Sequence, residues 1–315
     1  MKTPKEISLI LNKHLEKFMP ILTPFGVIMG FIVPNVLIHL RPFIPILFSV
    51  MTLSGSLRLK VKDLKGAVSD PLPLLFFLLI AHIIIPLSVF FSCNIFLKND
   101  PDTISGFVLL FSVPTAVSGF IWVSIYKGDT ALSLTLIMLD TLISPLVVPG
   151  TMSILFGTDV IFDMTGIAVS LILMVVIPTV LGVAIHEASK GKIPQIVSPY
   201  LNPFAKICLV LVIAANSSVV APQVRFDDPK VLVIAFLCVV FAIFGYVVSK
   251  IVGIIVKLGP EKRVAVFFAT GLRNISAATT IAIEYLPASA ALPALLGIVF
   301  QQSIAAIMGK ILSPR

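Results

Sequence analysis

Charged side chains are scarce in this chain of 315 residues, because Asp, Glu, Lys and Arg make up only 12% of it against 58% hydrophobic residues. Its mean hydropathy is +1.10. Soluble domains carry about 25% charged residues, so the composition excludes an ordinary soluble domain and indicates a membrane protein. A net charge of +8 would suggest nucleic-acid binding in a soluble protein. Here it fits an anionic lipid surface, so we expect the lipid bilayer as a partner and no nucleic acid.

Cysteine is also rare, and the motifs of membrane-embedded hydrolases are missing. Cys93, Cys208 and Cys238 lie in apolar runs without CxxC spacing or a histidine partner, which excludes a disulfide framework and a zinc site. We expect no metal and no cofactor. Paired intramembrane aspartates, a Ser-His or Ser-Lys arrangement and an HExxH motif are likewise not found in the sequence, so we predict that the protein is not an enzyme.

Long apolar runs fill the sequence instead. With about 20 residues for each transmembrane helix, division of the chain at its charges gives ten segments. They are residues 20–40, 43–57, 72–97, 103–126, 130–156, 162–186, 200–221, 231–256, 264–286 and 290–312. Residues 1–19 alternate lysines with leucines, which is typical of a basic amphipathic helix on the membrane face rather than a signal peptide. We therefore predict an all-α membrane protein.

The distribution of Lys and Arg predicts the orientation. Eighteen of these residues fall on one side of the ten segments, and only Arg41, Lys98, Arg225 and Lys230 fall on the other. The positive-inside rule then places both termini in the cytoplasm. No Ser- and Arg-rich transit segment precedes the first span, so we expect a multi-pass protein of the plasma (inner) membrane.

The ten segments divide into two halves, residues 20–156 and 162–312. Five spans in each half give the halves opposite orientations, as in inverted-repeat transporters. The fourth segment is interrupted at Pro114–Gly119 and the ninth at Thr270–Asn274. Unwound backbone at membrane depth must be covered by protein or hold a ligand, so matching interruptions indicate a transport site. The alternative is a kink at Pro114 and Gly119 whose freed backbone groups are bonded by neighbouring helices.

Several motifs resemble the bile acid:sodium symporter family over nearly the whole chain. The most specific is Gly-Asp-Thr-Ala-Leu-Ser-Leu-Thr at 128–135, and the others are GSLRL at 55–59 with Asp63-Leu64, PTAVSG at 114–119, IPT at 177–179 and ALP at 291–293. The resemblance implies ten helices, with the third to fifth and eighth to tenth forming a core, the other four a panel, and the broken fourth and ninth helices crossing. It also implies secondary transport of an organic anion by alternating access, usually driven by sodium.

The family's sodium ligands are only partly retained. Ser118 and Ser133 match ligand serines, but Gly119 replaces an asparagine, and Ile137 replaces a hydroxyl residue for which Thr135 is a possible substitute. Three further positions, which carry a glutamate and two glutamines in the family, read Ala269, Arg273 and Ala81, the last beside His82. Sodium needs several oxygen ligands, so we expect this chain not to use the two-sodium site of the family.

Two ionisable residues lie deep in the predicted core. Asp140 follows Ser133 by two helical turns on the same face, toward the crossing, and Arg273 lies at the second break. We hypothesise that the guanidinium stands as a fixed cation where sodium would bind, balanced by Asp140 or by a substrate carboxylate. A purely structural ion pair is the alternative. Coupling could then use protons, through Asp140 or His82.

The candidate sites follow from these arguments. Predicted substrate contacts are Thr115, Ser118, Gly119, Arg273, Asn274, Ser276, Gln301 and Gln302. Predicted ion-binding or coupling residues are Ser118, Ser133, Thr135, Asp140 and His82. Trp122 and Tyr126 fit aromatic residues at the membrane interface.

The leading functional hypothesis is a sodium-independent secondary transporter of a small organic anion. Three alternatives remain: a sodium-coupled symporter with rebuilt ligands including Asp140, a ligand sensor that no longer transports, and an arsenite efflux carrier. The last is disfavoured because it requires a thiol at the first break, where this chain has Pro114-Thr115.

Overall fold

The computed structural model describes residues 3–62, 71–98, 100–157, 163–224 and 227–312. Helices account for nearly all regular structure in these ranges. The predicted boundary between the two halves falls largely within 158–162, and Asp63, Leu64, Arg225 and Arg315 also lie outside the described residues.

The all-helical membrane protein is confirmed, but fewer spans than ten meet the criterion of length. Seven helices of the described ranges are long and apolar enough to cross a membrane, and a pair bent by 72° (Pro4–Met19 and Ile21–Ile32) would make eight. The predicted fourth and ninth spans are each split into two shorter helices, so neither half qualifies alone. The bend at residue 20 separates the basic segment 1–19 from the apolar helix that follows.

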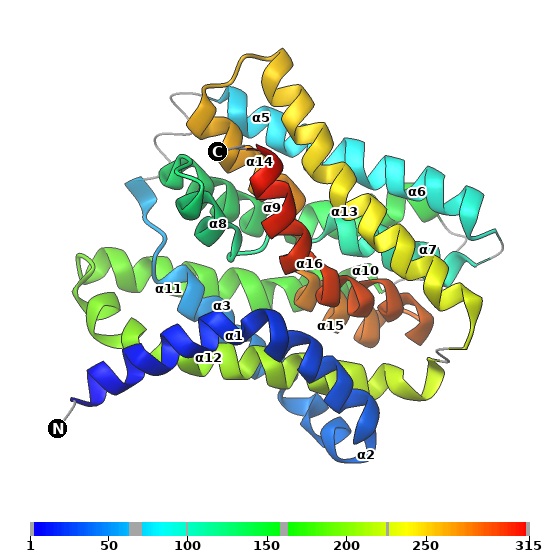
Figure 1. Cartoon of the computed structure of the whole chain (residues 1–315), viewed down its shortest axis with the longest axis horizontal. Helices are drawn as coiled ribbons and strands as arrows, with labels where there is room; N and C mark the ends of the chain where they lie inside the picture. The colour runs from blue at the N-terminus through cyan, green and yellow to red at the C-terminus, as the bar shows by residue number, and fades with distance from the viewer. Residues whose placement is uncertain (1–2, 63–70, 99, 158–162, 225–226, 313–315) are drawn as a thin grey trace. The chain divides into compact units, whose positions relative to one another are not determined.

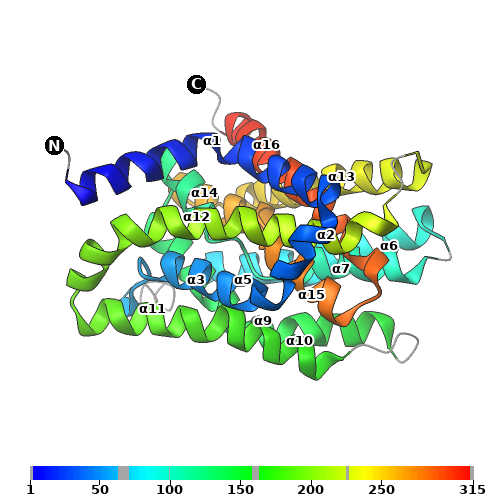
Figure 2. The ribbon, with the colours of Figure 1, turned by 90° about the horizontal axis from the view of Figure 1, so that it is seen from below.

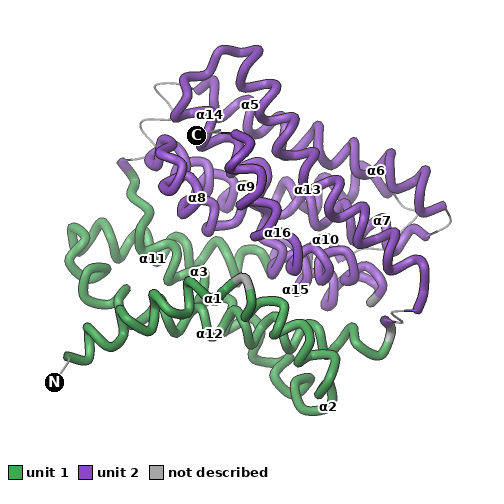
Figure 3. The backbone as a smooth tube through the Cα atoms, in the orientation of Figure 1, with its two compact units in different colours: residues 1–61, 170–222 green, residues 62–169, 223–315 purple. Residues whose placement is uncertain are grey.

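The chain forms two compact units, residues 1–61 with 170–222 and residues 62–169 with 223–315 (Figure 3). The first unit contains α1, α2, α3, α11 and α12 with two short turns of other helix types. Their bounds are α1 Pro4–Ile32, α2 Pro34–Leu37, η1 Ile38–Phe43, α3 Ile44–Ser56, η3 Ile172–Val176, α11 Ile177–Ala188 and α12 Lys192–Val220.

The pairing of α1 with α12 is the main contact of the first unit (Figure 2). Gly26 and Gly30 of α1 face α12, and a Cβ on Gly30 would lie only 2.4 Å from the Ser217 Cβ. Small residues four apart let two membrane helices approach closely. Ser217 therefore lies against a helix neighbour.

The first predicted span, 20–40, ends earlier than expected. The helix α1 stops at Ile32, and Val33 has φ −125° and ψ 53°, outside the helical region. Proline disfavours the helical conformation of the residue before it, so Pro34 forces the break after α1.

The second unit contains every candidate site residue. The bounds of its helices are α5 Leu72–Leu79, η2 Ile80–Ile84, α6 Ile85–Phe96, α7 Pro101–Ser112, α8 Gly119–Ile125, α9 Thr130–Phe156, α10 Met164–Leu171, α13 Pro229–Ile255, α14 Pro260–Gly271, α15 Ile275–Tyr285, η5 Ala288–Ala290 and α16 Ala291–Leu312. Figure 1 shows α13 in yellow beside α16 in red, and the two helices are in contact. The α10 helix continues into η3 of the first unit.

Large aliphatic side chains cover much of the outer surface. Ile154 is 83% exposed and Leu146 80% exposed, although both belong to the long helix α9. The same helix buries the polar side chains of Ser133, Thr135 and Asp140. An apolar exterior around a polar interior is the pattern expected in lipid, where polar groups need protein partners.

Candidate functional site

The two broken segments pair with each other. Thr115 and Arg273 form an isolated antiparallel β-bridge. The Ala116 amide donates to the Leu272 carbonyl over 3.0 Å, and the Asn274 amide donates to the Pro114 carbonyl over 2.8 Å. The unwound backbone of each break is therefore partly satisfied by the backbone of the other break.

Thr115 fastens this crossing with its side chain. Thr115 is 1% exposed. Its hydroxyl oxygen lies 2.7 Å from the Ala269 carbonyl and 2.8 Å from the Leu272 carbonyl. These carbonyls belong to the last turn of α14, where the helix supplies no further amides. The sequence predicted Thr115 as a substrate contact, whereas the structure gives its hydroxyl a role in joining the two breaks.

Asp140 is the anion of the site, and none of its surface is exposed. Its Oδ1 lies 2.7 Å from His82 Nε2, and its Oδ2 accepts a hydrogen bond of 2.7 Å from the Thr115 amide. Arg273 Nη1 approaches Oδ2 to 3.9 Å. Asp140 thus links α9, η2 and both breaks, as its position two turns after Ser133 led us to expect.

His82 reaches Asp140 from a π-helical turn. The Ile85 amide bonds to the Ile80 carbonyl five residues earlier. Pro86 follows, and it has no amide hydrogen for the His82 carbonyl, so the α-helical pattern cannot continue through this point. The second nitrogen of the ring, Nδ1, is buried without a hydrogen-bond partner among the described residues.

Arg273 is the cation of the site, and it is 2% exposed. Its Nη1 donates to the Val113 carbonyl over 3.3 Å, and its Nη2 donates to the Ala81 carbonyl over 2.7 Å. With Asp140, three oxygens from three separate segments surround the guanidinium. Arginine suits this position because it stays charged and presents its donors in a planar fork.

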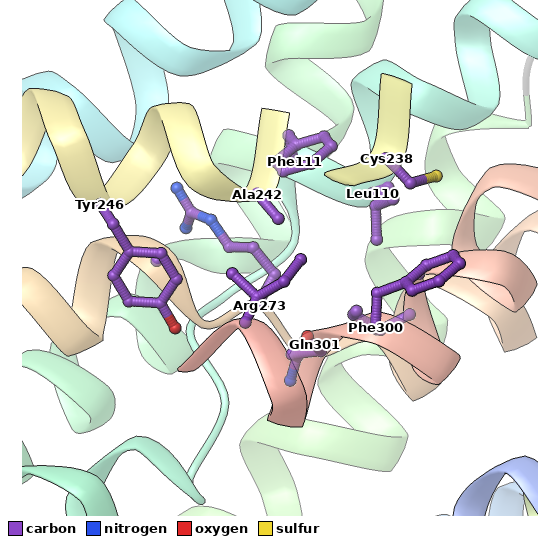
Figure 4. Close-up of a pocket in the computed structure, with 12 residues that line it drawn as sticks. Leu110, Phe111, Cys238, Ala242, Tyr246, Arg273, Phe300 and Gln301 are labelled. Atoms are coloured by element: carbon purple, nitrogen blue, oxygen red, sulfur yellow. The ribbon is translucent and has the colours of Figure 1, made fainter. Parts of the chain in front are cut away.

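A pocket within the second unit adjoins Arg273 (Figure 4). Its lining is mostly apolar, and Arg273, Tyr246 and Gln301 are the polar residues with nitrogen or oxygen in their side chains among those that line it. Arg273 Nε and the Tyr246 hydroxyl are both buried without a hydrogen-bond partner in the described part of the chain. The volume of this cavity is about 20 Å³, which is room for about one water molecule.

The other predicted residues make local contacts around the two breaks. Asn274 caps α15, since its side chain accepts a hydrogen bond from the Ala277 amide over 3.3 Å. Ser118 and Gly119 begin α8, and Ser276 is half-buried one residue into α15. Gln302 accepts a hydrogen bond from Trp122 Nε1 over 3.1 Å. Ser133 and Thr135 are buried on α9, about two turns and one and a half turns before Asp140.

Some residues at the site carry no signal in the sequence. Tyr246 lies in an apolar run and looks like a core aromatic residue. Its ring packs on Gly271, where an added Cβ would come within 2.2 Å of it. The position of Gly271 directly before the break was the only sequence clue. Trp122 and Tyr126, which we expected at the membrane interface, stack with Phe268.

Comparisons with known proteins agree with this architecture. A Bacillus subtilis protein described as "Uncharacterized protein YbaS" is 38% identical over 94% of this chain and 96% of its own length. The Arabidopsis thaliana "Probable sodium/metabolite cotransporter BASS3, chloroplastic" is 28% identical over 86% of this chain, which spans 61% of that relative. The "Uncharacterized sodium-dependent transporter YocS" of Bacillus subtilis is 20% identical over 84% of this chain and 81% of its own length.

These relatives include transporters and no enzymes, as the sequence predicted. The model of the Sodium Bile acid symporter family matches residues 45–225, which is more than half of the chain. Together with the YbaS relative, this match shows that the chain belongs to the sodium bile acid symporter family.

Proposed function

We propose that this chain is a secondary transporter of a small organic anion that works by alternating access and has Arg273 in place of a bound sodium ion. Membership in a family of sodium-coupled membrane transporters supports the transport activity. The division into two units, one with the broken helices and one without, supports movement of a core against a panel. We also propose that the chain is a ten-helix inverted repeat in the plasma membrane, with both termini in the cytoplasm.

The surroundings of Arg273 carry the proposal. Two backbone carbonyls and one carboxylate are the kind of oxygens that bind a hard cation, and here they face a guanidinium. A sodium ion at the same oxygens would meet the positive charge of Arg273. The oxygens that the family is expected to offer sodium at 269 and 273 are also replaced.

Counterflow in proteoliposomes tests the proposal. The purified chain is loaded with unlabelled carboxylates, and uptake of the same carboxylate labelled with ¹⁴C is measured in NaCl and in KCl. Pyruvate, lactate, succinate and cholate serve as probes. We expect exchange of at least one probe at equal rates in the two salts. Faster exchange in NaCl would favour the sodium-coupled alternative, and binding without exchange would favour the sensor.

Arg273→Gln should abolish exchange, whereas Arg263→Gln should not. Arg263 lies in the first turn of the same helix, α14, and is only half-buried. Arg273→Lys keeps a positive charge and separates loss of charge from loss of the folded state. If Arg273→Gln transports normally and only unfolds at a lower temperature, Arg273 has a structural role alone.

A further inference from the structure

His82, which pairs with Asp140, is the buried titratable side chain that the proposed function leaves unused. Its nitrogen and oxygen atoms are 2.7 Å apart, and the side chains are 7% and 0% exposed. Burial of a histidine costs free energy unless both of its ring nitrogens have hydrogen-bond partners. In this pair one ring nitrogen, His82 Nδ1, has no partner in the described residues.

With Asp140 ionised beside Arg273, the free ring nitrogen of His82 is a proton acceptor. Asp140 Oδ1 is an acceptor, so His82 Nε2 donates its hydrogen to it when the imidazole is neutral. Nδ1 then carries a lone pair without a hydrogen. A proton bound at Nδ1 would produce an imidazolium held by a carboxylate, which is a favourable charged pair.

The charges around the pair can be counted. Asp140 is the only ionisable residue on α9, and Arg273 is the only one at its break. The π-helical turn η2 also packs against α5, α6, α7 and α13. Their ionisable side chains in the described residues are Cys93, Asp102, Lys230, Cys238, Tyr246 and Lys250, and α5 has none. Asp102 and Lys230 lie at the starts of their helices, and Lys250 lies near the end of α13 and bonds to the Ile311 carbonyl. This leaves Asp140 and Arg273 as the charges that contact one another beside His82.

Asp140 and Arg273 therefore cancel each other while His82 is neutral. Protonation of His82 gives the cluster a net charge of +1, and a substrate monocarboxylate would return it to zero. No covalent bond is formed or broken apart from the N–H bond at Nδ1, and the proton comes from the aqueous phase. One proton and one monocarboxylate can thus be carried together without net charge.

We propose that His82 Nδ1, supported by Asp140, binds a proton that crosses the membrane together with the anionic substrate. This inference rests on the proposed transport function, since it names the coupling ion of the same site. In this proposal Arg273 holds the place of the sodium ion, and the proton on His82 takes over its part in coupling.

The first test observes the proton directly and needs no substrate. The full chain is labelled with ¹⁵N-histidine in detergent micelles, and the ring nitrogens are followed by NMR between about pH 5 and 8, the range in which histidine changes charge. His82→Gln assigns the His82 signals among those of the four histidines. We expect Nδ1 to gain a proton in this range, and we expect Asp140→Asn to weaken that signal at each pH. One unchanged neutral tautomer across the range would overturn the proposal.

The second test measures coupling in the proteoliposomes described above. An acidic exterior should accelerate uptake of the exchanging carboxylate, and His82→Gln should lose this acceleration. His186→Gln is the matched control, because His186 is also half-buried but bonds to the Leu57 carbonyl in the first unit, and it should keep the acceleration. Exchange without any acid effect contradicts the proton proposal alone. Absence of exchange for every probe contradicts the proposed function, and the NMR result then decides proton binding by itself.

Discussion

The Thr115 amide donates to the Asp140 carboxylate over 2.7 Å, and this bond ties the first break to the helix 25 residues further along the chain. Because the same carboxylate accepts a hydrogen bond from His82 and faces Arg273, a change at Asp140 disturbs three segments at once.

Asp140→Asn should destabilise the protein strongly. The amide keeps one acceptor oxygen but turns a donor toward either His82 Nε2 or the Thr115 amide, and it leaves the buried Arg273 without a counter-charge. Loss of one partner of a buried ion pair costs about 3–5 kcal/mol. We expect a clear fall in the melting temperature, measured by intrinsic fluorescence in detergent.

Asp129→Asn is the control for that variant. Asp129 precedes the same helix, and its side chain accepts a hydrogen bond from the Leu132 amide over 2.9 Å. Asparagine caps helices about as well as aspartate, so the melting temperature should hardly change. Equal losses in the two variants would mean that Asp140 has no special place in the structure.

Thr115→Val should weaken the crossing of the breaks. Valine keeps the shape but removes the hydroxyl that lies between the Ala269 and Leu272 carbonyls. The Leu272 carbonyl keeps the Ala116 amide, whereas the Ala269 carbonyl loses this hydroxyl donor. A buried acceptor without a partner costs about 1–3 kcal/mol. Thr115→Ser should retain most of the stability in thermal unfolding.

Thr279→Val provides the comparison for Thr115. Its hydroxyl also bonds a backbone carbonyl, that of Ile275, but it does so four residues back within α15. A helix carbonyl of this kind already accepts the amide of the helix, so the loss should be smaller. If Thr279→Val lowers the melting temperature as much as Thr115→Val, the Thr115 hydroxyl has no special role in joining the two breaks.

Gly271→Ala should be harmful although alanine usually favours helices. The added Cβ would overlap the Tyr246 ring, and overpacking of a buried position costs about 1–3 kcal/mol. The double variant with Tyr246→Ala should lose less than the sum of the two single variants. Gly150→Ala on α9 has no atom within 4 Å of the new Cβ, so it should be neutral or stabilising.

Acid should remove a contribution of Asp100 to stability. Burial would raise the pKa of Asp100, but hydrogen bonds from Thr103 and Lys230 and the charge of Lys230 hold the pKa below its ordinary value. Lys230 Nζ lies 2.9 Å from Asp100 Oδ2. A carboxyl whose pKa is lower in the folded state stabilises the protein above the unfolded pKa, near 3.9, and this stabilisation is lost as pH falls through the folded pKa.

Melting temperatures measured from pH 6 downward test this prediction. The wild type should lose more stability below about pH 4 than Asp100→Asn, whose side chain cannot titrate. Parallel curves for the two proteins would show that Asp100 contributes nothing to the acid sensitivity.

The sequence predicted the breaks because Pro114, Gly119 and Gly271 have local effects on the backbone. It also predicted the direction of Asp140, which depends only on helical periodicity from Ser133. It could not predict that Arg273 donates to the Val113 and Ala81 carbonyls, since these contacts join residues 160 and 192 positions apart. Every residue has a backbone carbonyl, so the amino-acid sequence does not show which carbonyls accept hydrogen bonds from Arg273.

Helix boundaries show the same division between local and distant causes. The end of α1 before Pro34 follows from the conformational effect of proline. The predicted first span, 20–40, extended beyond Pro34 because it was based on hydropathy alone. The π-helical turn at His82 also has a local cause in Pro86. The contact of Tyr246 with Gly271 depends on the packing of α13 against α14, which no local pattern in an apolar run reveals.

The antiparallel bridge between Thr115 and Arg273 also determines the electric field at the crossing. The carboxyl ends of α7 and α14 and the amino ends of α8 and α15 all terminate there. Helix dipoles place partial negative charge at the first two ends and partial positive charge at the others. The field is therefore that of a quadrupole, with adjoining places for a cation and an anion. The guanidinium fills the negative lobe at α7 permanently, so a chain without Arg273 would have to recruit a mobile cation from solution before it could hold an anion.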